Sequence, residues 1–113
     1  QPVVMEVFSG MLVSLSLTEG ILARKASLAE VSDTYRAFFK GAALVRVLED
    51  NPEAVIDSVA LSGSDRMELF VTGNDDRMIA YARFDNLGKG ACGAAIECLN
   101  LVLGAPPLTG LAL

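Results

Sequence analysis

Residues 84–104 read FDNLGKGACGAAIECLNLVLG, and the rest of the chain is organised around this stretch. It starts as the end of a strand, passes through a glycine-rich elbow at residues 86–90, and continues as a helix of small and apolar residues. Helix-forming residues begin at Ala91, and Gly104 with the prolines that follow is a strong stop signal. The first amides of such a helix are unpaired, so the elbow is a candidate site for a polar or anionic group.

The residues before the elbow predict an antiparallel hairpin. Residues 66–72 and 77–84 each alternate along the chain, and Gly-Asn-Asp-Asp at 73–76 is typical of the loop between two such strands. Residues 11–17 alternate in the same way and predict a further strand. Its apolar face comprises Met11, Val13, Leu15 and Leu17.

A helix is expected at residues 28–39, because Ser-Leu-Ala-Glu at 27–30 has the form of a capping box. The apolar face of this helix comprises Leu28, Val31, Tyr35 and Phe38, which we interpret as core packing. Additional strands are expected at residues 3–8 and 44–48, and within residues 54–61.

This order of elements predicts an α+β fold with a largely antiparallel sheet and helices on one face. At 113 residues, the chain is expected to form a single domain over residues 1–113. The sheet face opposite the helices is more apolar than a solvated face should be, since it carries Leu12, Phe70, Ile79 and Tyr81. We therefore expect a homo-oligomer that associates through this face.

Composition excludes several classes of function. The net charge is -5 and the basic residues are scattered, which argues against nucleic-acid binding. No apolar run approaches the ~20 residues of a membrane-spanning helix. The chain has no His, and Cys92 and Cys98 lie too far apart on one helix for a disulfide, so we expect neither a metal site nor a disulfide framework. Two unpaired thiols, expected to pack as small hydrophobes, fit a cytoplasmic protein.

Several motifs resemble one known family. Asp-Asn-Leu-Gly-Lys-Gly-Ala at residues 85–91, followed by Gly-Ala-Ala at 93–95, is similar to the C-terminal signature of N-acetyl-γ-glutamyl-phosphate reductases. Phe-Ser-Gly-Met-Leu-Val at 8–13 and Gly-Ser-Asp-Arg at 63–66 also resemble segments of these enzymes, so the resemblance spans roughly the whole chain. It implies an NADPH-dependent oxidoreductase of arginine biosynthesis, which reduces an acyl phosphate to a semialdehyde.

The resemblance also implies a division of labour between domains. The chain would be the dimerisation and substrate-side domain, similar to the C-terminal domain of the glyceraldehyde-3-phosphate dehydrogenase class, in which the sheet forms the subunit contact. It begins Gln1-Pro2, and we interpret it as part of a longer enzyme whose N-terminal Rossmann domain binds NADP. The family's catalytic Cys turn and its His are both missing here. We therefore expect no catalytic residue in this chain and no activity from it alone.

The resemblance implies that the elbow closes over the nicotinamide end of NADP, with Asn86, Gly88, Lys89 and Gly90 as the cofactor-binding residues. An Asn amide can satisfy both hydrogen-bonding edges of a carboxamide, and glycines leave bare backbone for the cofactor. The structural alternative is that Asp85 and Asn86 cap the helix and the glycines allow tight packing. Both interpretations stay open at this point.

Three further roles also stay open. Lys89 could neutralise a phosphate or simply be solvated, while Ser64 and Asp65 could bind a polar ligand or cap their own turn. The alternative function is a stand-alone, non-catalytic α+β module that dimerises through its sheet or binds a small ligand. The sequence that flanks the chain would distinguish this module from a reductase domain. The residues that recognise the particular acyl phosphate are expected upstream.

Overall fold

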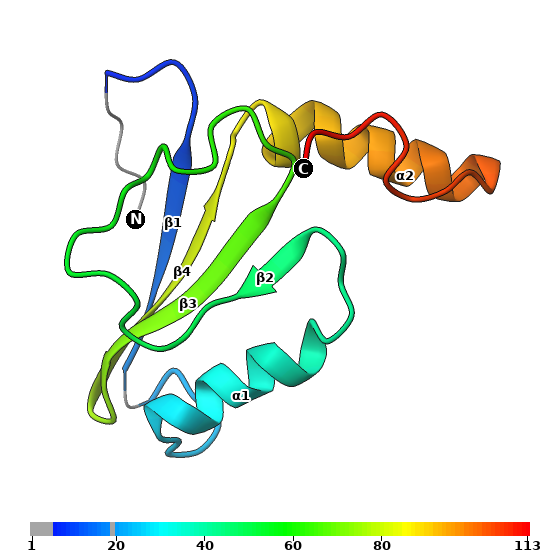
Figure 1. Ribbon diagram of the computed structural model, residues 1–113. Coiled ribbons are helices and arrows are strands. Elements are labelled where there is room, and N and C mark those ends of the chain that lie inside the picture. The colour runs from blue at the N-terminus through cyan, green and yellow to red at the C-terminus, as the bar shows by residue number, and fades with distance from the viewer. Residues whose placement is uncertain (1–5, 19) are drawn as a thin grey trace.

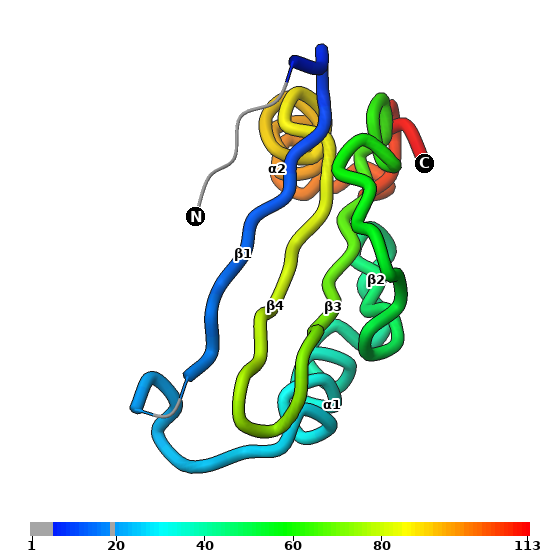
Figure 2. Tube along the Cα trace, turned by 90° about the vertical axis from the view of Figure 1, so that its left-hand side faces the viewer, coloured from blue at the N-terminus to red at the C-terminus, as the bar shows by residue number. Residues whose placement is uncertain are grey.

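The computed structural model describes residues 6–18 and 20–113, which form a four-stranded sheet and two α-helices. The strands are β1 (Met11–Leu17), β2 (Val45–Val47), β3 (Met67–Asn74) and β4 (Arg77–Phe84). The helices are α1 (Leu28–Phe38) and α2 (Gly93–Leu103), the latter preceded by a short π-helix, η1 (Gly88–Cys92). The strand order is β1-β4-β3-β2, with β4 antiparallel to both neighbours and β2 parallel to β3 (Figure 2). The predicted α+β fold with a largely antiparallel sheet is confirmed.

The predicted β3–β4 hairpin forms the centre of the sheet. Its turn is shaped by Asn74, whose Oδ1 accepts hydrogen bonds from the backbone N–H groups of Asp76 (3.1 Å) and Arg77 (3.0 Å). Gly73 has a φ of +111°, and a Cβ atom there would overlap the carbonyl of Arg77. Only glycine fits this position, so the presence of Gly73 determines where the hairpin turns.

One face of the sheet carries the helices, and we call it the helix face. Figure 1 shows α1 and α2 on the same side of the sheet, with α1 near the β3–β4 turn and α2 at the opposite end. The capping box of α1 is present: Ser27 Oγ accepts from the Glu30 N–H, and the Glu30 carboxylate accepts from the Ser27 N–H. Under α1 lies the core cluster, which comprises Leu17, Leu28, Val71, Met78 and Ala80.

The helix face is covered over only part of its length. On the apolar face predicted for β1, Leu17 is buried at the α1 end. Met11, Val13 and Leu15 are exposed, because they lie on an edge strand beyond the reach of α1. Phe38 is 79% exposed, so its predicted place in the core is wrong. It is the last residue of α1, and its ring packs edge-on against Phe39.

The opposite face, which we call the strap face, is crossed by residues 52–63 (Figure 1). The buried side chain of Arg83 holds this crossing segment. Its guanidinium pairs with Glu53 (2.9 and 3.1 Å) and donates to the carbonyl of Asp57 (3.0 Å). It also pairs with Glu68 on β3 (2.6 Å), so one cation joins the crossing segment to the sheet.

The strand expected within residues 54–61 is wrong, because this part of the crossing segment forms bends and turns. Asp57 Oδ1 accepts from the Val59 N–H at 2.9 Å, a local bond that competes with strand pairing. The strand expected at residues 3–8 falls mainly outside the described residues, and residues 6–8 are not in a strand.

Phe70 lies on the predicted face, but it is not available to a second copy. It is 1% exposed, stacks on Tyr81 and lies beneath the guanidinium of Arg83. Arg83 and the crossing segment that it binds therefore cover Phe70. Leu12, Ile79 and Tyr81 remain half-buried on the same face.

Candidate functional site

The elbow begins directly after β4, where Asp85 is 2% exposed. Its Oδ1 accepts from the N–H groups of Leu87 (2.7 Å) and Gly88 (3.0 Å), while Oδ2 accepts from the Gly63 N–H (2.5 Å). The bond from Gly63, followed by those from Gly88 and Leu87, outweighs burial and lowers the pKa of Asp85 to about 2. The carboxylate of the chain itself therefore occupies elbow amides that could have received an anionic ligand. Asp85 thus binds two backbone N–H groups where η1 begins, but it is not the N-cap residue of η1 or α2: those are Leu87 and Cys92, and neither makes a side-chain cap bond.

Two glycines, one within the elbow and one just after it, are required by close packing. A Cβ atom on Gly88 would lie 2.8 Å from the Ser64 carbonyl oxygen and 2.9 Å from Asp65 Oδ1. A Cβ atom on Gly93 would overlap the Asp65 carboxylate. Neither glycine has a positive φ. The predicted tight packing is confirmed, and it brings the loop before β3 against the start of α2.

Ser64 and Asp65, for which two roles were open, both bind backbone within this end of the fold. Ser64 Oγ accepts from the Arg66 N–H at 3.1 Å, which caps the turn before β3. Asp65 Oδ2 accepts from the Ala112 N–H at 2.8 Å, and the Asp65 N–H donates to the Ala112 carbonyl at 2.7 Å. Both side chains therefore stabilise this end of the fold.

Asn86 does not cap the helix, which corrects one part of the structural interpretation. Its Oδ1 accepts from the Gly10 N–H at 2.9 Å, and this bond ties the elbow to the residue before β1. Among the described residues, Nδ2 of Asn86 has no hydrogen-bond partner, and the side chain is half-buried. One edge of the amide is thus fixed by the fold, and the donor edge remains for another group.

Lys89 and Gly90 complete the elbow. Lys89 is 13% exposed in its side chain, and its Nζ pairs with Glu97 Oε2 on α2 at 2.5 Å. The interpretation of Lys89 as a simply solvated residue is therefore wrong. Gly90 is exposed, and its N–H donates to the Asp85 carbonyl at 2.8 Å. The elbow thus offers a donor amide, a paired ammonium and bare backbone within five consecutive residues.

Asn100 is a buried residue at this end that local pattern reasoning missed. Its Nδ2 donates to the carbonyls of Pro107 (3.0 Å) and Thr109 (2.9 Å), which folds the C-terminal segment back along α2. An Asn in a helix whose only other strongly polar residue is Glu97 was the available signal. Gly10 and Gly63 also contribute N–H groups to the elbow, but they come from distant parts of the chain.

The two cysteines are exposed and unpaired, so the expectation that they pack as small hydrophobes is wrong. They lie on η1 and α2, and α2 extends away from the sheet rather than lying beneath a second layer (Figure 1). Cys92 Sγ donates to the Leu87 carbonyl at 2.9 Å. Residues 6–18 and 20–113 contain no group of three or more side chains placed to bind a metal, and no helix among them is long and apolar enough to cross a membrane.

Comparison with known proteins gives the family. The family described as "Semialdehyde dehydrogenase, dimerisation domain" matches residues 1–86. The chain belongs to this family of dimerisation domains. Residues 87–113, which include most of the elbow and all of α2, lie beyond that match.

Curated relatives extend the similarity of this dimerisation domain across the elbow. The chain is 34% identical to N-acetyl-gamma-glutamyl-phosphate reductase 2 of Nostoc sp., over 97% of this chain and 37% of the relative. It is 39% identical to N-acetyl-gamma-glutamyl-phosphate reductase of Brucella ovis, over 84% of this chain and 32% of the relative. The resemblance to these reductases is confirmed, and the chain spans about a third of their length.

Proposed function

We propose that this dimerisation domain serves an NADPH-dependent N-acetyl-γ-glutamyl-phosphate reductase of arginine biosynthesis, in the cytoplasm. In that enzyme an acyl phosphate is reduced to a semialdehyde, and the chain provides the subunit contact and the substrate-side part of the active site. The observation that carries the proposal is the identity of 34% with a reductase of this name over 97% of the chain. An N-terminal Rossmann domain would bind NADP.

The proposal assigns the covalent chemistry to the remainder of the enzyme. Reduction of an acyl phosphate through a thioester needs a thiolate nucleophile, a proton-transfer group and a hydride donor. This chain has no His. Cys92 directs its thiol to the Leu87 carbonyl. We expect the isolated chain to be inactive.

The elbow is the part of this chain that we propose contacts the cofactor. Because Asn86 Oδ1 is held by the Gly10 N–H, the amide is oriented and its Nδ2 is the group that would donate to the nicotinamide carboxamide oxygen. Gly88 and Gly90 would present backbone against the ring. Lys89 would reach a phosphate only by exchanging its bond to Glu97, so we assign it a positioning role within the elbow.

The exposed apolar surface of α2 is where we propose that the remaining part of the enzyme packs. Four large apolar side chains near the end of this helix are exposed: Leu99, Leu101, Val102 and Leu103. An exposed apolar patch of this kind is typical of a contact with another domain or chain. That the contacting domain is the Rossmann domain follows from the resemblance.

The subunit contact is proposed for the open part of the strap face, where Leu12, Ile79 and Tyr81 are half-buried. Ile79→Asp should convert a dimer to a monomer, because a carboxylate would have to be desolvated in the contact. Val13→Asp is the matched control, since Val13 is exposed on the helix face of the same sheet. Sedimentation with a circular dichroism check of folding distinguishes the two. Dissociation by Val13→Asp alone would move the contact to the helix face.

Activity is tested by following NADPH absorbance with N-acetyl-γ-glutamyl phosphate. We expect turnover from the longer enzyme that contains this chain and none from the chain alone. Absence of turnover in the longer enzyme would contradict the proposed substrate. If the chain alone showed turnover that survived Cys92→Ser and Cys98→Ser, the assignment of catalysis to another domain would be wrong.

A further inference from the structure

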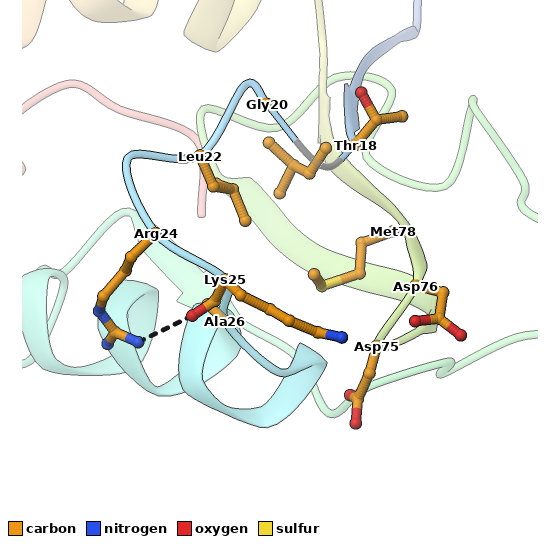
Figure 3. Close-up of a pocket in the computed structure, with 10 residues that line it drawn as sticks. Thr18, Gly20, Leu22, Arg24, Lys25, Ala26, Asp75, Asp76 and Met78 are labelled. Carbon is orange, nitrogen blue, oxygen red and sulfur yellow. Dashed lines mark hydrogen bonds between the residues drawn. The ribbon is translucent and has the colours of Figure 1, made fainter.

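A cavity of about 270 Å³ lies at the end of the sheet opposite the elbow (Figure 3). It is lined by the end of β1, by described residues between 20 and 26 that precede α1, and by the β3–β4 hairpin. Leu17, Leu22 and Met78 give it an apolar floor that is continuous with the core under α1. Its volume is just below the range of about 300–1,000 Å³ typical of pockets for drug-sized ligands. The size therefore suits a ligand with few heavy atoms.

The two walls of this cavity carry opposite charges. Lys25 comes from the loop before α1, and Figure 3 shows its side chain reaching across the cavity toward the hairpin that carries Asp75 and Asp76. No hydrogen bond or ion pair joins the Lys25 ammonium to any described residue, and the same holds for the Asp76 carboxylate. Within the part of the chain that the structure describes, both charges are therefore available to a ligand.

The neighbouring charges are already engaged. Asp75 Oδ1 accepts from the Leu28 N–H at 2.9 Å, so this carboxylate caps the start of α1. The Arg24 guanidinium pairs with Glu30 and donates to the Lys25 carbonyl, and Figure 3 shows it directed away from the hairpin wall. Among the described residues that line the cavity, Lys25 and Asp76 are therefore the unpaired cation and anion, on opposite walls above an apolar floor.

We propose that this cavity binds a small zwitterion with an aliphatic body, an α-amino acid of about the size of leucine. Its carboxylate binds the Lys25 ammonium, its ammonium binds the Asp76 carboxylate, and its side chain packs on Leu17, Leu22 and Met78. Each of the two charged contacts pairs a group that has no partner among the described residues. The site is independent of the proposed reductase activity, because it shares no residue with the elbow and lies at the other end of the β3–β4 hairpin.

Other ligand classes fit these walls less well. A phosphate beside Lys25 would face the like charges of Asp75 and Asp76, and a divalent cation beside the carboxylates would face Lys25. A purely apolar ligand would cover the floor but leave both free charges to be desolvated without a partner. Only a ligand with both signs of charge matches both walls.

The test is a titration of the 113-residue chain with L-leucine, followed by amide chemical shifts in NMR spectra. We expect saturable shifts confined to the cavity. Isoamylamine, which lacks the carboxylate, and 4-methylpentanoate, which lacks the ammonium, should each bind at least about tenfold more weakly. A Kd for L-leucine weaker than about 10 mM, or equal binding of the three compounds, would overturn the proposal.

Two variants and one control tie the effect to the assigned charges. Lys25→Gln and Asp76→Asn should each weaken L-leucine binding by about tenfold, because each removes one charge-assisted contact. Lys40→Gln, an exposed residue after α1 and outside the cavity, should leave the Kd unchanged. All three positions are exposed, so we expect the variants to fold, and their amide spectra report this directly. Loss of binding in Lys40→Gln, or none in the other two, would contradict the site.

Discussion

The two ends of the β3–β4 hairpin use charged residues in opposite ways. At the elbow end, Asp85 and Asp65 are buried and accept hydrogen bonds from backbone N–H groups of distant segments. At the turn end, Lys25 and Asp76 are exposed around a cavity and have no partner among the described residues. The difference indicates that paired buried charges build the fold, whereas unpaired charges beside a cavity are available to a ligand.

The largest effect on stability is expected from Asp85→Ala. It removes the side-chain acceptor of three backbone N–H groups, those of Gly63, Leu87 and Gly88, whose hydrogen bonds to Asp85 are partly buried. The free energy of unfolding should fall by about 3–5 kcal/mol, as urea denaturation would measure. Asp76→Ala is the control from the other end, where we expect a change within about 0.5 kcal/mol. Similar losses in both variants would remove the distinction between the two ends.

A smaller loss is expected from Arg83→Met, which removes the cation between Glu53 and Glu68 while keeping an apolar side chain. Because Glu53 is partly exposed and can be solvated, the free energy of unfolding should fall by about 2–3 kcal/mol. Hydrogen exchange of residues 52–63 should rise as the crossing segment loosens. Arg46→Met, on the exposed side of β2, is the control. Unchanged exchange in the Arg83 variant would mean that other contacts hold the segment.

The pH dependence of stability tests the contribution of Asp85 at the elbow end of the β3–β4 hairpin. The pKa of Asp85 is lowered from 3.8 to about 2, so the folded protein prefers the ionised form. The stabilisation is present above the unfolded pKa and is lost as pH falls through the folded pKa. Unfolding free energy should therefore decrease between about pH 4 and about pH 2, and Asp85→Asn should flatten this part of the profile. An equal decrease in the variant would assign the effect to other carboxylates.

The sequence predicted what is local. Period-two alternation identified β1, β3 and β4, and the capping box identified the start of α1, because each signal lies within a few residues. The hydrogen bonds that Asp85 accepts from the Leu87 and Gly88 N–H groups are also local, since both residues follow it closely. These elements depend on neighbours along the chain, so their residues alone were sufficient.

Features that depend on distant residues could not be predicted in this way. Asn86 Oδ1 accepts a hydrogen bond from the Gly10 N–H, 76 residues earlier. No residue near Asn86 in the sequence indicates that this oxygen is occupied. Phe70 lay on the predicted face, but the pair between Arg83 and Glu53, 30 residues apart, brings the cover that buries it. The cavity likewise joins Lys25 to a hairpin about half the chain away. Topology, rather than periodicity, decides these features.

The central claim is that the elbow contacts NADPH in the longer reductase, and Asn86 tests it most directly. Asn86→Asp keeps the oxygen that accepts from the Gly10 N–H but removes the Nδ2 donor, whereas Asn86→Ala removes both. Steady-state kinetics and melting temperature should be measured on the same preparation of each variant. We predict that kcat/KM for NADPH falls in both variants, by a factor that corresponds to a loss of about 1–3 kcal/mol of transition-state stabilisation. The melting temperature should fall mainly in Asn86→Ala. Unchanged NADPH kinetics in folded Asn86→Asp would contradict the cofactor contact and leave Asn86 as a tie between the elbow and β1.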